Sequence, residues 1–304
     1  MTPHERSGLA YAVTGFAVLS CGDAVVKSMA GEWPPYAVAA LRFAIGAIGL
    51  SVLLWRKEGV EAFRPQNWKL QLARGICLAF ASACFFTALF IMPMAEAMAI
   101  GFLAPILTQA FAGLFLREKV RPKVYLVSVA ALAGVAMILR PNLAELGLAA
   151  FLPVGSAIFF ALMMVANRAS AGQGSALSAQ AFIALFCAPI LIVGATAAKF
   201  SGVPSLDFGW SSWDVAARCA VVAVTASTAH WLAYIGTTRA GAAQVAPAIY
   251  VQMLVVVVLG WAFFGEIPDT MTLIGASVII ASGLYLWRDG VRAGKIAELQ
   301  AERT

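Results

Sequence analysis

The stretch AFFGEIPD at residues 262–269 ends a long apolar run with a glutamate, and LFLREKVR at 114–121 does the same earlier in the chain. The two glutamates, Glu118 and Glu266, stand 148 residues apart. An apolar segment that recurs with the same ending indicates an internal repeat of the kind found in membrane proteins. The spacing of 148 residues gives the register in which the two copies align.

The composition excludes an ordinary soluble domain. Such a domain carries about 25% charged residues, whereas this chain carries 12%, with 62% hydrophobic residues and a mean hydropathy of +0.86. The net charge of +6 does not indicate a nucleic-acid partner, because the basic residues lie between apolar segments rather than in one stripe. The five cysteines lie in apolar segments without metal-ligand spacing, which predicts free thiols, no metal and no cofactor.

The apolar segments are long enough to cross a bilayer, which takes about 20 residues of helix. Lipid leaves backbone groups no partner outside the chain, so each segment is predicted to be a helix. The fold class is therefore an all-α integral membrane protein with ten transmembrane helices. The predicted spans are residues 8–28, 36–55, 72–92, 95–116, 123–140, 146–167, 179–199, 215–238, 241–264 and 271–287.

Basic residues predict the orientation. With the N-terminus inside, the cytoplasmic stretches hold fifteen Lys and Arg residues, and the opposite side holds only Lys27, Arg140 and Lys199. Cytoplasmic loops carry the excess of positive charge. The sequence thus predicts a multi-pass protein of the inner (plasma) membrane with both termini cytoplasmic.

The 148-residue shift also places GVAMILRP at 134–141 on SGLYLWRD at 282–289 without a gap. This predicts two five-helix repeats, 1–142 and 143–290, followed by a cytoplasmic tail, 291–304. Because five is odd, the second repeat is inverted in the membrane. Inverted repeats are typical of alternating-access transporters, in which the two halves exchange roles.

Ten spans, an inverted five-plus-five repeat and an apolar helix ending in Leu/Phe-x-Glu in each half resemble the drug/metabolite transporter superfamily. Within it, residues 8–288 are similar to EamA-type exporters, including bacterial amino-acid exporters. The resemblance implies a central cavity formed by spans 1, 3, 4, 6, 8 and 9. The family pattern has a proline before each glutamate; Pro105 fits, but Met253 stands at the second position. Pro105 and Pro247 are therefore the predicted hinges.

The motifs of common enzymes are missing. Neither G-x-x-x-x-G-K-[ST] nor H-E-x-x-H occurs, and no G-x-S-x-G elbow supports a protease built on Ser156 and His230. We therefore expect no catalytic residues and no ATP hydrolysis.

Charged residues inside the spans need a partner or a purpose. Asp23 and Arg42 are predicted about 8–10 Å deep on adjacent helices, and Lys27 follows Asp23 by four residues. A structural ion-pair cluster is the first interpretation; an outer gate or a proton-coupling site is the alternative. Glu118 and Glu266 are expected to act as solvated caps or as ties between helices.

Ring-bearing and neutral polar residues lie near the predicted membrane centre. His230 is about 13 Å inside span 8, where no Arg or Lys was placed. Such a site suits a small amphipathic solute, although helix packing would also explain these residues. The predicted substrate-binding residues are Phe86, Phe102, Gln109, Phe159, Met163, His230, Trp231, Tyr234, Tyr250 and Gln252.

The sequence thus predicts a secondary transporter that exports small amphipathic solutes, foremost neutral or aromatic amino acids or related metabolites. A multidrug or metabolite exporter of the same fold is the alternative, and a channel or intramembrane scaffold is the alternative of another class. The expected partners are a small-molecule substrate and the lipid bilayer. Proton coupling, and the choice between monomer and homodimer, stay open.

Overall fold

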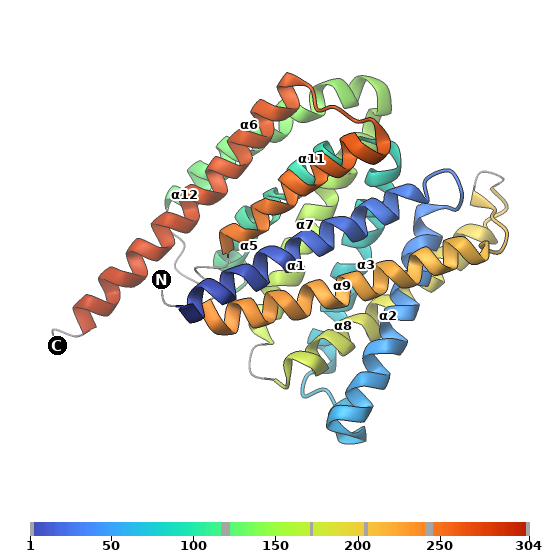
Figure 1. Cartoon of the computed structure of the whole chain (residues 1–304), viewed down its shortest axis with the longest axis horizontal. Coiled ribbons are helices and arrows are strands. Elements are labelled where there is room, and N and C mark those ends of the chain that lie inside the picture. Colours follow the sequence, from blue (N-terminus) through green and yellow to red (C-terminus); the bar gives the residue numbers. More distant parts are fainter. Residues whose placement is uncertain (1–2, 117–121, 171–172, 204–205, 241–245, 302–304) are drawn as a thin grey trace.

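The computed structural model describes residues 3–116, 122–170, 173–203, 206–240 and 246–301, and every regular element within them is a helix (Figure 1). Short 3-10 helices are labelled η. The elements are α1 (Pro3–Ser28), α2 (Pro35–Glu58), η1 (Val60–Phe63), α3 (Trp68–Ile91), α4 (Met94–Gly101), α5 (Leu103–Phe115), α6 (Pro122–Leu146), η2 (Gly147–Phe151), α7 (Leu152–Ala169), α8 (Ala176–Lys199), α9 (Trp213–Ala240), η4 (Ala246–Tyr250), α11 (Val251–Phe264) and α12 (Thr270–Ala301).

Eight segments in the described part of the chain are long and apolar enough to cross a membrane. The protein is therefore an all-helical, multi-pass membrane protein. Two further apolar helices, Tyr125–Leu139 and Ala248–Phe264, are shorter and occupy the predicted spans 5 and 9. The count of ten spans stays a prediction.

Two predicted spans are interrupted where continuous helices were expected. Span 95–116 divides into α4 and α5 at Phe102, and span 241–264 changes from the 3-10 helix η4 to α11 after Tyr250. Pro105 is the third residue of α5 and has no N–H to donate to the preceding turn, which accounts for the first break. Phe102 and Tyr250 correspond under the 148-residue shift, so both breaks fall at the same position of the predicted repeat.

Two predicted boundaries fall inside helices. The predicted end of the first half, residue 142, lies within α6, which continues to Leu146. The predicted tail begins inside α12, which runs without interruption to Ala301, and its assignment to the cytoplasm stays a prediction. At the start of α12, Asp269 Oδ1 accepts a hydrogen bond from Thr272 N at 2.6 Å, as an N-cap does.

Glycines allow two helix pairs to approach closely. Helix α1 runs antiparallel along α9 (Figure 1), and a Cβ atom at Gly15 would lie 2.8 Å from the carbonyl oxygen of Ala229. Helices α6 and α12 meet in the same way, because a Cβ at Gly134 would lie 2.8 Å from the carbonyl oxygen of Gly275. Helix association in lipid depends on such close backbone packing rather than on hydrophobic burial.

The packing has a two-fold pattern. Helix α1 packs on α9, α3 on α7, α2 on α8, and α6 on α12. The 148-residue shift relates α1 to α7 and α3 to α9, and therefore carries the first of these pairs onto the second. The other two pairs are carried onto themselves. This is the arrangement that the predicted inverted repeat requires; the repeat itself stays a prediction.

Replacing Gly134 by Ala is expected to lower the free energy of unfolding by about 1–3 kcal/mol, because the added methyl group displaces the α12 backbone. The matched control is Gly194→Ala in α8, where a Cβ meets nothing within 4 Å. The control is expected to be neutral or slightly stabilising, since Ala is the better helix former. Thermal unfolding of both purified variants in detergent measures the difference. Equal stability of the two variants would contradict the packing argument.

Candidate functional site

Glu266 is positioned by the way α11 ends. Gly265 adopts φ +65°, a left-handed conformation that glycine adopts without strain. The chain then turns back, so that Glu266 N donates to Gly260 O at 3.0 Å. A Cβ at Gly260 would lie 3.3 Å from Glu266 Oε2, so the absence of a side chain there leaves room for the carboxylate.

The Glu266 carboxylate connects three parts of the chain. Its Oε1 lies 2.5 Å from Lys27 Nζ of α1, and its Oε2 accepts a hydrogen bond from Met94 N of α4 at 2.8 Å. Lys27 Nζ also donates to Met92 O at 2.7 Å. Glu266 was expected to act as a solvated cap or as a tie between helices, and these contacts make it a tie. Glu118, its predicted counterpart, lies outside the described residues.

The prediction that Lys27 pairs with Asp23 was wrong. Its four-residue spacing from Asp23 suggested a pair within α1, but Lys27 forms its ion pair with Glu266. The reason is tertiary: the turn after Gly265 fixes a carboxylate beside the 92–94 turn, within reach of the long lysine side chain. A second polar contact lies nearby, where Thr272 Oγ1 of α12 donates to Glu96 Oε1 of α4 at 3.4 Å.

A charged and aromatic cluster lies deep in the bundle, around Arg42 of α2. The guanidinium carbon lies 4.1 Å from the ring centroid of Phe43 and 5.6 Å from that of Phe86 on α3. Asp23 of α1 and His230 of α9 are both within electrostatic reach of Arg42. We call these five residues the Arg42 cluster. Its members come from both predicted halves of the chain.

The Arg42 cluster corrects the prediction in two ways. The sequence assigned Asp23 and Arg42 to an outer ion-pair site and assigned Phe86 and His230 to a separate substrate site, whereas the structure brings the four together. The expectation that no basic residue lies near the predicted binding site was also wrong. Hydropathy locates each span separately. The lateral and vertical offsets between neighbouring spans are set by packing that a single sequence does not show.

The charges of this cluster are not directly paired. Within the described chain, Asp23 and Arg42 form no ion pair within 4 Å, and Arg42 Nε is buried without a hydrogen-bond partner. Asp23 and Arg42 are half-buried and His230 is exposed, although all three lie deep in the bundle. His230 Nδ1 lies 2.6 Å from Ala226 O, so this nitrogen carries the proton and donates it, and a neutral ring leaves Nε2 as an acceptor.

Several predicted substrate residues instead fill packed space. Phe102 and Tyr250 contact each other edge to face, with centroids 5.3 Å apart at 71°. Phe102 is 2% exposed, and the Tyr250 hydroxyl lies directly against Gly283 of α12. Met163 and Gln252 are buried as well. For these four residues the packing interpretation, left open by the sequence, fits the structure better.

The remaining predicted residues lie apart from the cluster or outside the described side chains. Phe159 stacks on Phe80, with centroids 5.1 Å apart, and Gln109 is half-buried on α5. Trp231 is 62% exposed, and no described contact joins it to the Arg42 cluster. Pro105 is half-buried beside the break at Phe102. The side chains of Tyr234 and Pro247 lie outside the described part of the structure.

The sequence analysis did not predict a polar network near the N-terminal end of α3, opposite the end where Lys27 and Glu266 meet. Arg74 is 3% exposed; its Nε donates to Asn167 Oδ1 of α7 at 2.5 Å and its Nη2 to Ala179 O of α8 at 3.3 Å. Its Nη1 donates to Gln71 Oε1. The signal was present, because a Gln and an Arg three residues apart share one face of an otherwise apolar helix. The charge count had assigned Arg74 to neither side of the membrane.

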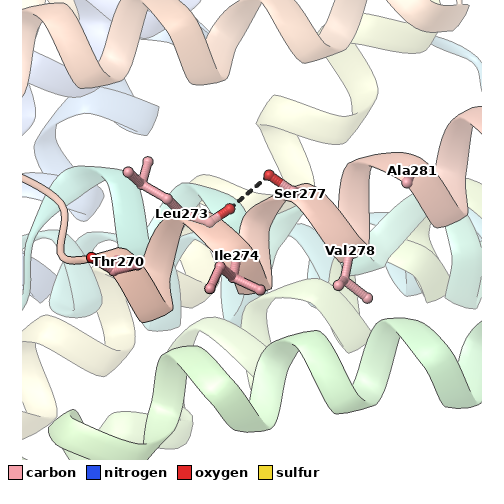
Figure 2. Close-up of a pocket in the computed structure, with 6 residues that line it drawn as sticks. All are labelled: Thr270, Leu273, Ile274, Ser277, Val278 and Ala281. Atoms are coloured by element: carbon pink, nitrogen blue, oxygen red, sulfur yellow. Dashed lines mark hydrogen bonds between the residues drawn. The ribbon is translucent and has the colours of Figure 1, made fainter.

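An apolar groove lies on α12 (Figure 2). The hydroxyl of Ser277 is already bonded, since it donates to Leu273 O at 2.7 Å. Apart from Ser277 and Thr270 the lining is apolar, so the groove offers few groups to orient a polar solute, unlike the Arg42 cluster. It is lined by Thr270, Leu273, Ile274, Ser277, Val278 and Ala281.

Comparison with known proteins identifies the family. The sequence pattern of the EamA-like transporter family matches residues 6–140 and 147–288. The chain belongs to this family. It is 27% identical to the pseudopaline exporter CntI of Pseudomonas aeruginosa (strain UCBPP-PA14), over 93% of this chain and 96% of that protein.

Other relatives of this EamA-family protein carry different solutes. The S-adenosylmethionine uptake transporter of Rickettsia bellii is 24% identical over 92% of each chain. The riboflavin transporter of Rhizobium johnstonii is 25% identical over 78% of this chain and 76% of its own. A solved structure described only as "Crystal structure of protein" shares the fold, with a TM-score of 0.61 and 21% identity over 91% of this chain and 96% of its own. The protein is thus a membrane transporter, with its substrate not fixed by its relatives.

A double-mutant cycle tests the Lys27–Glu266 tie. Lys27→Met, Glu266→Gln and the double variant are expected to show a coupling of about 1–2 kcal/mol in unfolding free energy, since both groups are largely shielded from water. The same cycle on the exposed pair Arg64–Glu61, at 3.0 Å, is the control and is expected to show no measurable coupling. Indistinguishable couplings in the two cycles would mean that Glu266 ties nothing together.

Proposed function

We propose that this protein is a secondary transporter of the inner membrane that exports small amphipathic solutes, foremost neutral or aromatic amino acids or related metabolites. The observation that carries this proposal is the Arg42 cluster. Its aromatic rings, its unpaired charges and the free acceptor of His230 lie deep in the bundle on helices of both predicted halves. Partly exposed polar groups at such a depth are expected to border an opening rather than to fill a packed core.

Alternating access is supported by the polar contacts at the two ends of α3. The Lys27–Glu266–Met94 contacts lie at its C-terminal end and the Arg74–Asn167 contacts near its N-terminal end. Arg74 and Met92 are separated by about 27 Å of helix. A carrier needs one closed gate on each side of its site, and these two contact sets are the candidates. The breaks at Phe102 and Tyr250 supply points at which the helices can bend.

Export is favoured by the similarity to the pseudopaline exporter, over 93% of this chain, and by the resemblance to amino-acid exporters. The uptake transporters in the same family show that the fold does not fix direction. A multidrug or metabolite exporter remains the second candidate, and the aromatic rings beside Arg42 are compatible with it. A channel or scaffold has no need for polar contacts at both ends of the same helix.

Purified protein in proteoliposomes is expected to show saturable uptake and counterflow of at least one of the twenty amino acids, because a carrier exchanges solute across its site. In cells, expression is expected to lower the internal and raise the external level of the same amino acid. Uptake that does not saturate and shows no counterflow would indicate a channel. Uptake only of lipophilic cations or dyes would indicate the multidrug alternative.

His230→Ala is expected to reduce counterflow at least tenfold, since it removes the hydrogen-bonding ring beside Arg42. The control is Val224→Ala, which truncates a 64% exposed side chain on the same helix and is expected to transport like the wild type. Monodisperse elution and unchanged thermal unfolding show that both variants fold. Wild-type counterflow by His230→Ala would remove this residue from the site.

A further inference from the structure

We infer that Asp23 and Arg42 together bind a zwitterionic head group, with the solute carboxylate on Arg42 and its ammonium group on Asp23. This inference rests on the proposed transport function and names the chemical class of its substrate. It was not predicted from the sequence, which assigned the two residues to a structural ion pair or a gate.

The first argument is the energy of unpaired charge. A carboxylate and a guanidinium deep among membrane helices are costly unless each is neutralised. Here the two are close enough to interact electrostatically, yet they form no contact within 4 Å in the described part of the chain. A solute that carries both charges can complete two ion pairs at once. A solute with one charge would complete only one of them.

The second argument is the geometry around Arg42. Two aromatic rings lie beside the guanidinium, whose carbon is 4.1 Å from the ring centroid of Phe43 and 5.6 Å from that of Phe86. Its Nε is buried without a hydrogen-bond partner. A carboxylate is the planar acceptor that matches two parallel N–H groups of arginine. Phe43 and Phe86 are both buried beside the guanidinium and restrict its movement, so little freedom is lost on binding.

The third argument is the remaining chemistry of the Arg42 cluster. His230 Nδ1 is engaged with Ala226 O, which leaves Nε2 as a hydrogen-bond acceptor near Arg42. Phe86 is 4% exposed, so it packs beside the guanidinium of Arg42 and leaves the hydrogen-bonding groups to face the solute. Asp23 repels a simple anion and Arg42 repels a simple cation. The two residues together therefore select against solutes that carry only one charge.

The test uses matched solutes that differ only in the head group. L-tryptophan carries both charges, tryptamine lacks the carboxylate, and indole-3-propionate lacks the ammonium group; the leucine and phenylalanine series serve in parallel. Each is supplied in counterflow to wild-type proteoliposomes. The zwitterion is expected to exchange at least tenfold faster than either single-charge analogue in at least one series.

The variants then assign each charge. Arg42→Gln and Asp23→Asn are each expected to reduce exchange of the zwitterion at least tenfold. Arg42→Lys is expected to recover part of it, because it keeps the charge but loses the paired donors. Arg42→Gln is expected to raise the exchange of the amine relative to that of the zwitterion. Asp23→Asn is expected to raise the exchange of the acid in the same way. Arg56→Gln, an exposed change on the same helix α2, is the control and is expected to transport like the wild type.

A further measurement does not depend on the folding of these variants. The zwitterion is expected to raise the Tm of the wild type. Either analogue is expected to raise it less. Equal exchange of zwitterion, amine and acid, or wild-type exchange by Arg42→Gln, would overturn the head-group assignment while leaving the transporter intact. No saturable counterflow with any solute would overturn the proposed function and this inference together.

Discussion

Lipid supplies no hydrogen bonds, and this constraint governs the structure from the backbone to the site. It forces the chain into helices, and it makes each polar side chain within the bundle either a fastening between helices or a functional group. Glu266 and Arg74 belong to the first kind, because each of them binds groups on other elements of the chain. Asp23 and Arg42 belong to the second, because nothing in the described chain neutralises them directly.

The same constraint explains why small residues matter. Without a hydrophobic force between helices, contact depends on close approach. Gly15 and Gly134 provide it where α1 meets α9 and where α6 meets α12. Glycine has a different role at position 265, where its positive φ ends α11 and places the Glu266 carboxylate against Lys27 and Met94. A backbone conformation at one residue thereby fixes a contact between three parts of the chain.

Hydropathy and the family resemblance were enough to predict an all-helical membrane transporter, because both depend on properties averaged over many residues. The individual contacts were not predictable to the same degree. Lys27 was paired by sequence spacing, but the pair is set by the turn after Gly265. Trp231 and His230 are neighbours in sequence, yet adjacent positions on a helix point about 100° apart, and only His230 reaches the Arg42 cluster. The break at Phe102 was invisible to a hydropathy window, which averages over many residues, and the sequence signal for it is Pro105, three residues later.

The contact between Phe102 and Tyr250 has a consequence for the origin of the chain. These residues occupy equivalent positions if the two halves are copies, and equivalent residues touch each other only on an axis of symmetry. In an ancestor made of two identical half-length subunits, this position would have met its own copy across a self-complementary interface. Fusion of two such subunits would leave the two positions free to differ, as Phe102 and Tyr250 do, since only Tyr250 carries a hydroxyl, and it lies against Gly283.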